Sequence, residues 1–173
     1  MSFPNERTYS FDANNVLSDN AAAYTASGYL QAGGADGIVD FGGNQGVTIT
    51  LPSIDDVSSI TPQQPRIDAV LIVDVTAIDI ASGNETYQLD LMVSNDPAFA
   101  AGNVVCAGGV QMGKGTSLRG AVAQKDSVTG RYELMFSNNI AGAIYQYAKA
   151  YLTAGGTTPS VSITSYISVL PEP

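Results

Sequence analysis

The chain has 173 residues, the size of one domain, and a formal net charge of −9 with only seven Lys and Arg residues. These basic residues are spread along the sequence, so we expect no patch that could neutralise several phosphates, and binding to nucleic acid or to an anionic membrane surface is disfavoured. The absence of His and the single cysteine exclude a Cys–His pair and an intramolecular disulfide.

The N-terminal part of the sequence has little hydrophobic periodicity. Residues 1–20 are interpreted as an arm, and their start, MSFPNERTYSFD, has no apolar run, so we expect no signal peptide. A short helix is a candidate near Asp12–Ala22. Weak strands are expected near Ala23–Leu30 and Ile38–Phe41.

The middle of the chain alternates between apolar and polar residues, which is the period of a β-strand. This alternation predicts strands at Val47–Leu51, Ile67–Ala77 and Tyr87–Val93. A second short helix is a candidate at Pro97–Ala101.

A glycine-rich stretch, GGVQMGKGTS at residues 108–117, has most of the spacing of a phosphate-binding loop. Such a loop needs a Ser or Thr directly after its Lys to hold Mg²⁺, but Gly115 follows Lys114 here. No helical pattern follows either, so we interpret the stretch as a flexible turn after a weak strand near Val104–Val110, and expect no nucleotide binding. The apolar neighbours of Cys106 predict that this residue is buried.

Three further strands are predicted in the C-terminal part, at Arg131–Phe136, Ile144–Leu152 and Val161–Val169. The second of these has a core side and a tyrosine-rich side, the latter with Tyr145, Tyr147, Lys149 and Tyr151. Tyrosines on a second face are compatible with a protein interface, a sugar-binding platform or ordinary cross-strand packing.

Eight or nine short strands separated by Gly, Asn and Pro turns predict an all-β fold. We expect a single antiparallel β-sandwich or jelly roll of about eight strands over residues 21–170, with a short tail at residues 171–173. Within it, the carboxylate pairs Asp36/Asp40 and Asp55/Asp56 could hold Ca²⁺ or serve a hydrolase. Neither has a known motif spacing, so we expect solvated turns, no catalytic residues, no cofactor and no metal.

Three runs of sequence carry a resemblance to a known family. They are RIDAVLIVDVTAIDIASGNETYQLDLMVSNDPAFA, then GRYELMFSNN, then YQYAKAYLTAGGTTPSVSITSYI. Preceded by an IVDFGG strand, their order of strands and turns resembles the jelly-roll capsid cement (decoration) proteins of tailed bacteriophages. The resemblance covers about residues 38–169 and lies in strands and turns rather than in a catalytic signature. The segment Val47–Pro65 looks longer than the family needs, which implies an insertion loop.

The resemblance implies a structural protein of the virion, made in the host cytoplasm, and not an enzyme. Such a protein sits as a homotrimer on the outside of the head, bridges major capsid protein subunits and helps the shell withstand packaged DNA. The candidate interface is then Tyr145, Tyr147 and Tyr151, with Lys114 and Arg119 as partners for coat carboxylates. The low share of charged residues, 13%, is typical of a surface covered by neighbours. The alternative is a carbohydrate-binding jelly-roll module of a phage fibre or adhesin.

Overall fold

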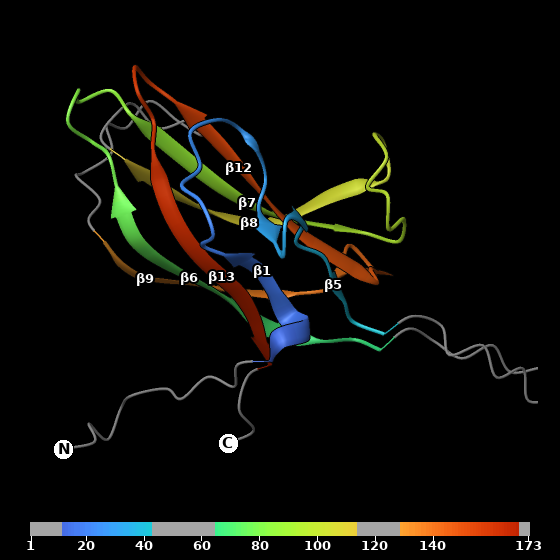
Figure 1. Cartoon of the computed structure of the whole chain (residues 1–173). Helices are drawn as coiled ribbons and strands as arrows, with labels where there is room; N and C mark the ends of the chain where they lie inside the picture. The colour runs from blue at the N-terminus through green and yellow to red at the C-terminus, as the bar shows by residue number, and fades with distance from the viewer. Residues whose placement is uncertain (1–11, 43–64, 114–128, 170–173) are drawn as a thin grey trace, which may run out of the picture.

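The structure, a computed structural model, describes residues 12–42, 65–113 and 129–169. In these ranges the chain is almost entirely β-strand, and the strands form two main antiparallel sheets around a shared core (Figure 1). The all-β sandwich predicted from the sequence is confirmed. The described ranges contain one short helical element, the 3-10 turn η1 at Ala13–Asn15.

The first sheet, called sheet I, has four strands. Their spatial order is β1 (Val16–Asp19), β13 (Val161–Val169), β6 (Asp68–Ile78) and β9 (Gly130–Ser137). The long pairing of β13 with β6 runs from Val161 opposite Ile78 to Val169 opposite Ala69. Sheet I is therefore held together by strands from the beginning, the middle and the end of the chain.

The second sheet, called sheet II, has five strands. The main path is β2 (Gly28–Tyr29), β12 (Tyr147–Gly155), β7 (Thr86–Ser94) and β8 (Val104–Gly113), and β5 (Val39–Asp40) also pairs with β12. Two small hairpins complete the described strands: β3 (Gln31–Ala32) with β4 (Ala35–Asp36), and β10 (Asn139–Ile140) with β11 (Ala143–Ile144). Both two-residue hairpin turns have positive φ at their two central residues, the geometry that matches the twist of paired strands.

The main core lies between the two sheets and follows the alternation seen in the sequence. Along β7, Tyr87, Leu89, Leu91 and Val93 all point inward and are at most 1% exposed. The alternate residues of β6, β12 and β13 do the same, so the predicted inward faces are confirmed. Each fully buried aliphatic side chain contributes about 1.5–3 kcal/mol relative to an exposed one.

Sheet I also buries apolar residues on its outward face. Val70 and Ile72 of β6 alternate with the core residues, yet both are fully buried, and Tyr166 of β13 is 6% exposed. These three residues, with Val16 packed against them, form a second apolar group that we call the outer cluster. The alternation of β6 thus predicts its inward face, but the outward face is apolar as well.

Both predicted short helices are wrong. Asp12 accepts a hydrogen bond from the Asn14 amide and starts a single 3-10 turn, after which Val16–Asp19 form β1 against β13. A strand of the fold therefore lies within the predicted arm of residues 1–20. In Pro97–Ala101 the chain makes a turn, and the φ of Phe99 is +51°, which a right-handed helix does not allow.

The glycine-rich turn is also reinterpreted, because residues 108–113 belong to β8. Gly109 lies so close to β7 that an added Cβ would overlap the Asp90 and Gln88 side chains, and one on Gly108 would press on Leu134 of the other sheet. Glycine here permits close packing in a strand. The predicted strand Val47–Leu51 and nearly all of Val47–Pro65 lie outside the described residues.

Candidate functional site

The tyrosine-rich side of β12 forms part of the outward face of sheet II. Ala148, Ala150 and Leu152 are fully buried in the core, so Tyr147, Lys149 and Tyr151 point the other way. The strand begins at Tyr147 rather than at the predicted Ile144, which belongs to β11. This outward face therefore carries Tyr147 and Tyr151, two of the three tyrosines of the predicted interface.

Lys149 is the centre of this face, and it is nearly buried. Its ammonium nitrogen lies 5.0 Å from the ring centroid of Tyr29 and 5.0 Å from that of Phe99. It also donates a hydrogen bond of 3.2 Å to a carboxylate oxygen of Asp36. The Lys149 side chain is 10% exposed, whereas that of Asp36 is 44% exposed. We call Tyr29, Asp36, Phe99, Lys149 and Tyr151 the lysine cluster.

Phe99 reaches the lysine cluster through a tightly bonded loop between β7 and β8. The Ser94 hydroxyl donates to the Asn103 carbonyl and accepts from the Asp96 amide. Asp96 in turn accepts hydrogen bonds from the amides of Ala98 and Ala100, and these bonds lower the pKa of its carboxyl group. The SNDPAF sequence therefore encodes a closed turn, whose positive φ at Phe99 directs the ring onto Lys149.

Tyr151 and Tyr29 pack edge to face within the lysine cluster. Their ring centroids are 5.1 Å apart with an interplanar angle of 83°. Burial, followed by the nearby Asp36 and Tyr151, raises the pKa of Tyr29. The ring of Tyr151 is thus engaged by the chain's own β2, and Phe99 adds a second edge contact to Tyr29 at 6.1 Å.

Tyr145 lies apart from the other two tyrosines of the predicted interface. It precedes β12, packs against the main core and lines a cavity of about 420 Å³. Asn138, which is 1% exposed, fixes its backbone, because the Asn138 amide group donates to the Tyr145 carbonyl and the Tyr145 amide donates to the Asn138 carbonyl. The structure therefore brings Tyr147 and Tyr151 to one face, but places Tyr145 against the main core and beside the loop between β7 and β8.

The cavity beside Tyr145 is polar, but its side chains are already bonded. Asn95 donates to the Ile144 carbonyl and accepts from the Gln146 amide. Asp96 is occupied by the turn described above, and Asn103 donates to it at 3.5 Å. The polar groups of this cavity hold the loop together, which leaves few of them to bind a ligand.

Strand β8 forms the outer edge of sheet II, and on it the predicted burial of Cys106 is wrong. Cys106 is exposed, because it lies opposite Met92 on the outward side of β8. The pairing shifts between Leu91 and Met92, where Ala107 forms a bulge that sends Val105 and Gly108 to the same inward side. Apolar neighbours in sequence therefore did not bury the thiol.

Strand β8 is an edge strand without charged residues. Among the described strands it pairs with β7 only, and its sequence VVCAGGVQMG has no Lys, Arg, Asp, Glu or Pro. The edge of sheet I, β9, contrasts with it. There Arg131 makes two bonds of 2.7 and 2.8 Å to Asp74, which hold the pKa of Arg131 above its ordinary value, and Glu133 is exposed.

The described carboxylates of the candidate pairs, Asp36 and Asp40, are each bonded within the fold. Asp36 binds Lys149, while Asp40 accepts from the Gly42 amide and the Gln146 side chain. Within the described ranges no group of three or more Cys, Asp or Glu side chains could hold a metal ion. Asp55, Asp56, Lys114 and Arg119 lie outside the described residues.

Comparison of the chain with protein-family models, with curated proteins and with solved structures gives no match. The helical content of the described ranges includes no helix long and apolar enough to cross a membrane.

Proposed function

We propose that this chain is a structural protein of a bacteriophage virion, a jelly-roll cement protein that binds the outer surface of the head. In this proposal it acts as a homotrimer, bridges major capsid protein subunits and has no catalytic activity. The strand order that resembles this family corresponds to β6, β7, β9, β12 and β13 of the sandwich.

The observation that carries the proposal is the uncharged edge of β8. Natural sheets protect an edge that faces water with charged residues, Pro or irregular pairing, because unpaired backbone groups attract other strands. The edge strand β9 carries charges of this kind, whereas β8 has a bulge at Ala107 but no charge over Val104–Gly113. An edge with this composition fits a surface that meets another protein chain.

A trimer with such edges suits the mechanism of a cement protein. Each subunit offers a modest contact, and three linked contacts act together once the first has formed. Because the protein binds the assembled shell better than free coat subunits, bound copies stabilise the shell by mass action. The affinity of one edge can therefore be small while the stabilisation of the head is large.

The test combines purified protein with heads that lack it. We expect cryo-electron microscopy to show the protein at three-fold and quasi-three-fold positions, and we expect the temperature of DNA release to rise. A chain that neither decorates the heads nor raises that temperature refutes the proposal. A glycan array run in parallel tests the alternative carbohydrate-binding module.

A matched pair of variants tests the edge itself. Cys106→Lys places a charge on the exposed position of β8, whereas Ala26→Lys makes the same change of charge at an exposed loop residue. Cys106→Ser controls for the loss of the thiol. We expect only Cys106→Lys to lower occupancy on the heads, and equal occupancy for all three variants would rule out β8 as the contact.

A further inference from the structure

The lysine cluster holds an amine and a carboxyl group at the distance of two reacting groups. Nζ of Lys149 lies 3.2 Å from Oδ2 of Asp36, and the carbon Cγ of the same carboxyl group is bonded directly to that oxygen. Two groups that a fold holds about 3–3.5 Å apart react as if they were present at very high concentration. The pair therefore has the spacing that formation of an amide bond requires.

Little water reaches the amine of this pair. The Lys149 side chain is only 10% exposed, and the ring centroids of Tyr29 and Phe99 each lie 5.0 Å from its nitrogen. A lysine amine acts as a nucleophile in proteins where it is withdrawn from water. Because separated charges are costly in such surroundings, one proton can pass from the ammonium to the carboxylate and leave both groups neutral.

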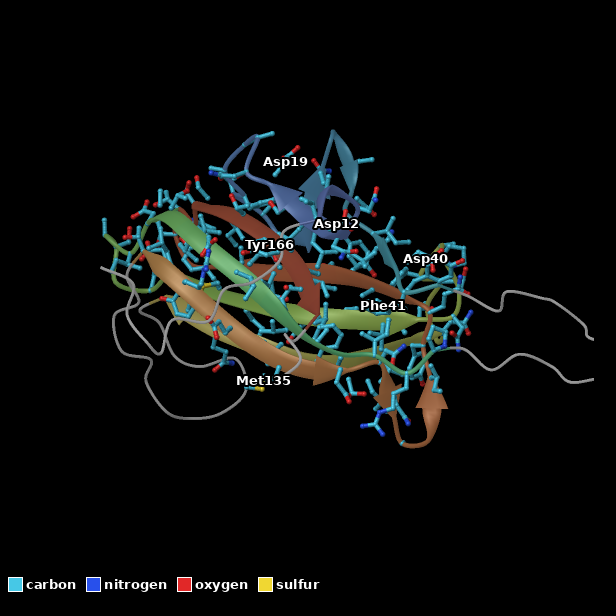
Figure 2. All side chains as sticks on the ribbon, turned by 90° about the horizontal axis from the view of Figure 1, so that it is seen from below. Asp12, Asp19, Asp40, Phe41, Met135 and Tyr166 are labelled. Carbon is cyan, nitrogen blue, oxygen red and sulfur yellow. The ribbon has the colours of Figure 1, made fainter. Side chains whose placement is uncertain are left out.

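The hairpin that carries Asp36 is fixed to its surroundings by backbone contacts. The Leu30 amide, just before β3, donates to the carbonyl of Ala150, the residue that follows the lysine in β12. At the hairpin turn the Gly33 amide donates to a carboxylate oxygen of Asp19, which is labelled beside the hairpin in Figure 2. The carboxyl group and the amine are thus held together by contacts other than their own ion pair.

We propose that the side chains of Lys149 and Asp36 join in an intramolecular amide bond, which links β12 to the β3–β4 hairpin. The ammonium first gives one proton to the carboxylate, and the lone pair of Nζ then attacks Cγ. The bond from Cγ to the protonated oxygen breaks, and the leaving hydroxyl takes a second proton from the nitrogen and departs as water. The reaction consumes no oxidant, cofactor or partner, and the inference does not depend on the proposed function.

The exposure of the carboxyl group makes this reaction slow. The Asp36 side chain is 44% exposed, so water stabilises its ionised form, which does not react with an amine. The same exposure gives the released water a path to the solvent. Freshly folded protein therefore holds the ion pair, and we expect the amide bond to accumulate with time.

The experiment follows the intact mass of the folded, full-length protein at physiological temperature over several weeks. We expect a growing share of chains to become lighter by one water molecule. Proteolytic digestion should then yield two peptides joined to each other, one containing Asp36 and the other Lys149. Because the bond joins residues 113 positions apart, it keeps the denatured chain compact, and the linked form should migrate faster in a denaturing gel.

Lys149→Arg is the matched control. It keeps a cation between the rings, but a guanidinium stays protonated and does not attack a carboxyl group. This variant should keep its full mass. It also controls for a second reaction that releases water, the closure of Asp36 and Gly37 into a cyclic imide, because that reaction needs no lysine. If the arginine variant does not fold by circular dichroism, Lys149→Met takes its place with the same expected mass.

Three results would overturn the inference. One is wild-type protein that keeps its full mass throughout the incubation. Another is loss of water at the same rate in the wild type and in the control variant. The third is a digest in which the lost water lies within the Asp36–Gly37 peptide and no joined peptides occur, since that outcome would assign the change to the imide.

Discussion

We predict that the two partners of the ion pair in the lysine cluster, Asp36 and Lys149, contribute unequally to the stability of the fold. Asp36→Ala leaves the Lys149 ammonium without an anion while its side chain is only 10% exposed. Lys149→Met leaves the Asp36 carboxylate without a cation, but that side chain is 44% exposed and water can solvate it. Removing the exposed partner should therefore destabilise the fold more than removing the buried one.

The contacts of Lys149 set the size of the two effects. A hydrogen bond to a charged group contributes about 1.5–3 kcal/mol, and the exposure of Asp36 reduces this by solvent screening, so we expect Asp36→Ala to cost about 1–2 kcal/mol. Lys149→Met loses the contacts with the rings of Tyr29 and Phe99, at about 0.5–2 kcal/mol each. It also removes a poorly solvated charge and keeps an apolar stem between the rings, so its net cost should be below about 1 kcal/mol.

The measurement is urea unfolding followed by far-ultraviolet circular dichroism, with thermal melts as a second readout. For a domain of this size, 1 kcal/mol corresponds to about 2–4 °C, so Asp36→Ala should lower the melting temperature by about 2–8 °C. The double variant Asp36→Ala/Lys149→Met should be at least as stable as Asp36→Ala alone, because the uncompensated ammonium is gone. A larger loss for Lys149→Met than for Asp36→Ala would refute the reasoning.

Three other predictions follow from single positions. Gly113 has a φ of +101°, and an added Cβ would lie 2.4 Å from the Glu85 carbonyl oxygen, whereas a Cβ on Gly83, with a φ of +78°, would meet open space. Gly113→Ala should therefore lower the free energy of unfolding in urea by about 2–5 kcal/mol, and Gly83→Ala by about 1–2 kcal/mol. Equal losses for the two variants would contradict this. The pKa of Asp96 is lowered in the folded state, so its contribution to the stability of the fold is present above the unfolded value of 3.8 and is lost as the pH falls through the folded value. Asp96→Asn should therefore reduce the decrease in stability that the protein shows below about pH 4. An unchanged dependence of stability on acid pH would contradict this. Cys106 should react with a thiol reagent in the native protein, and reaction only upon unfolding would show that it is buried.

The long strands of the sandwich could be predicted from the sequence because their hydrophobic alternation fixes both their type and their inward face. Leu89, Leu91 and Val93 are on the side that the pattern assigns to them. The exposure of Cys106 could not be predicted in this way. The bulge at Ala107 puts Val105 and Gly108 on the same side, and a bulge is determined by the pairing with β7 rather than by β8 alone.

The lysine cluster was also beyond the sequence pattern, for a different reason. Alternation correctly puts Lys149 and Tyr151 on the second face of their strand, but it says nothing about what lies over that face. Its partners Tyr29, Asp36 and Phe99 come from distant segments and are brought together by sheet order and by the SNDPAF turn. Only the polar turn residues of that loop were visible as a signal.

The packing of the tyrosines on sheet II helps to distinguish the two proposed functions, a protein-binding strand edge and a sugar-binding aromatic surface. A stacking platform needs an aromatic ring face that is open to the ligand. Tyr151 packs edge to face with Tyr29, whose ring also lies near the Lys149 ammonium, and Phe99 is only 6% exposed. The rings of the lysine cluster are thus used to solvate and hold a cation inside the domain. Among the strands that the structure describes, β8 is an edge of sheet II, and it carries no charged residue. Because uncharged strand edges meet other strands more readily than sugar rings, the composition of β8 supports the proposal of a protein partner rather than a glycan.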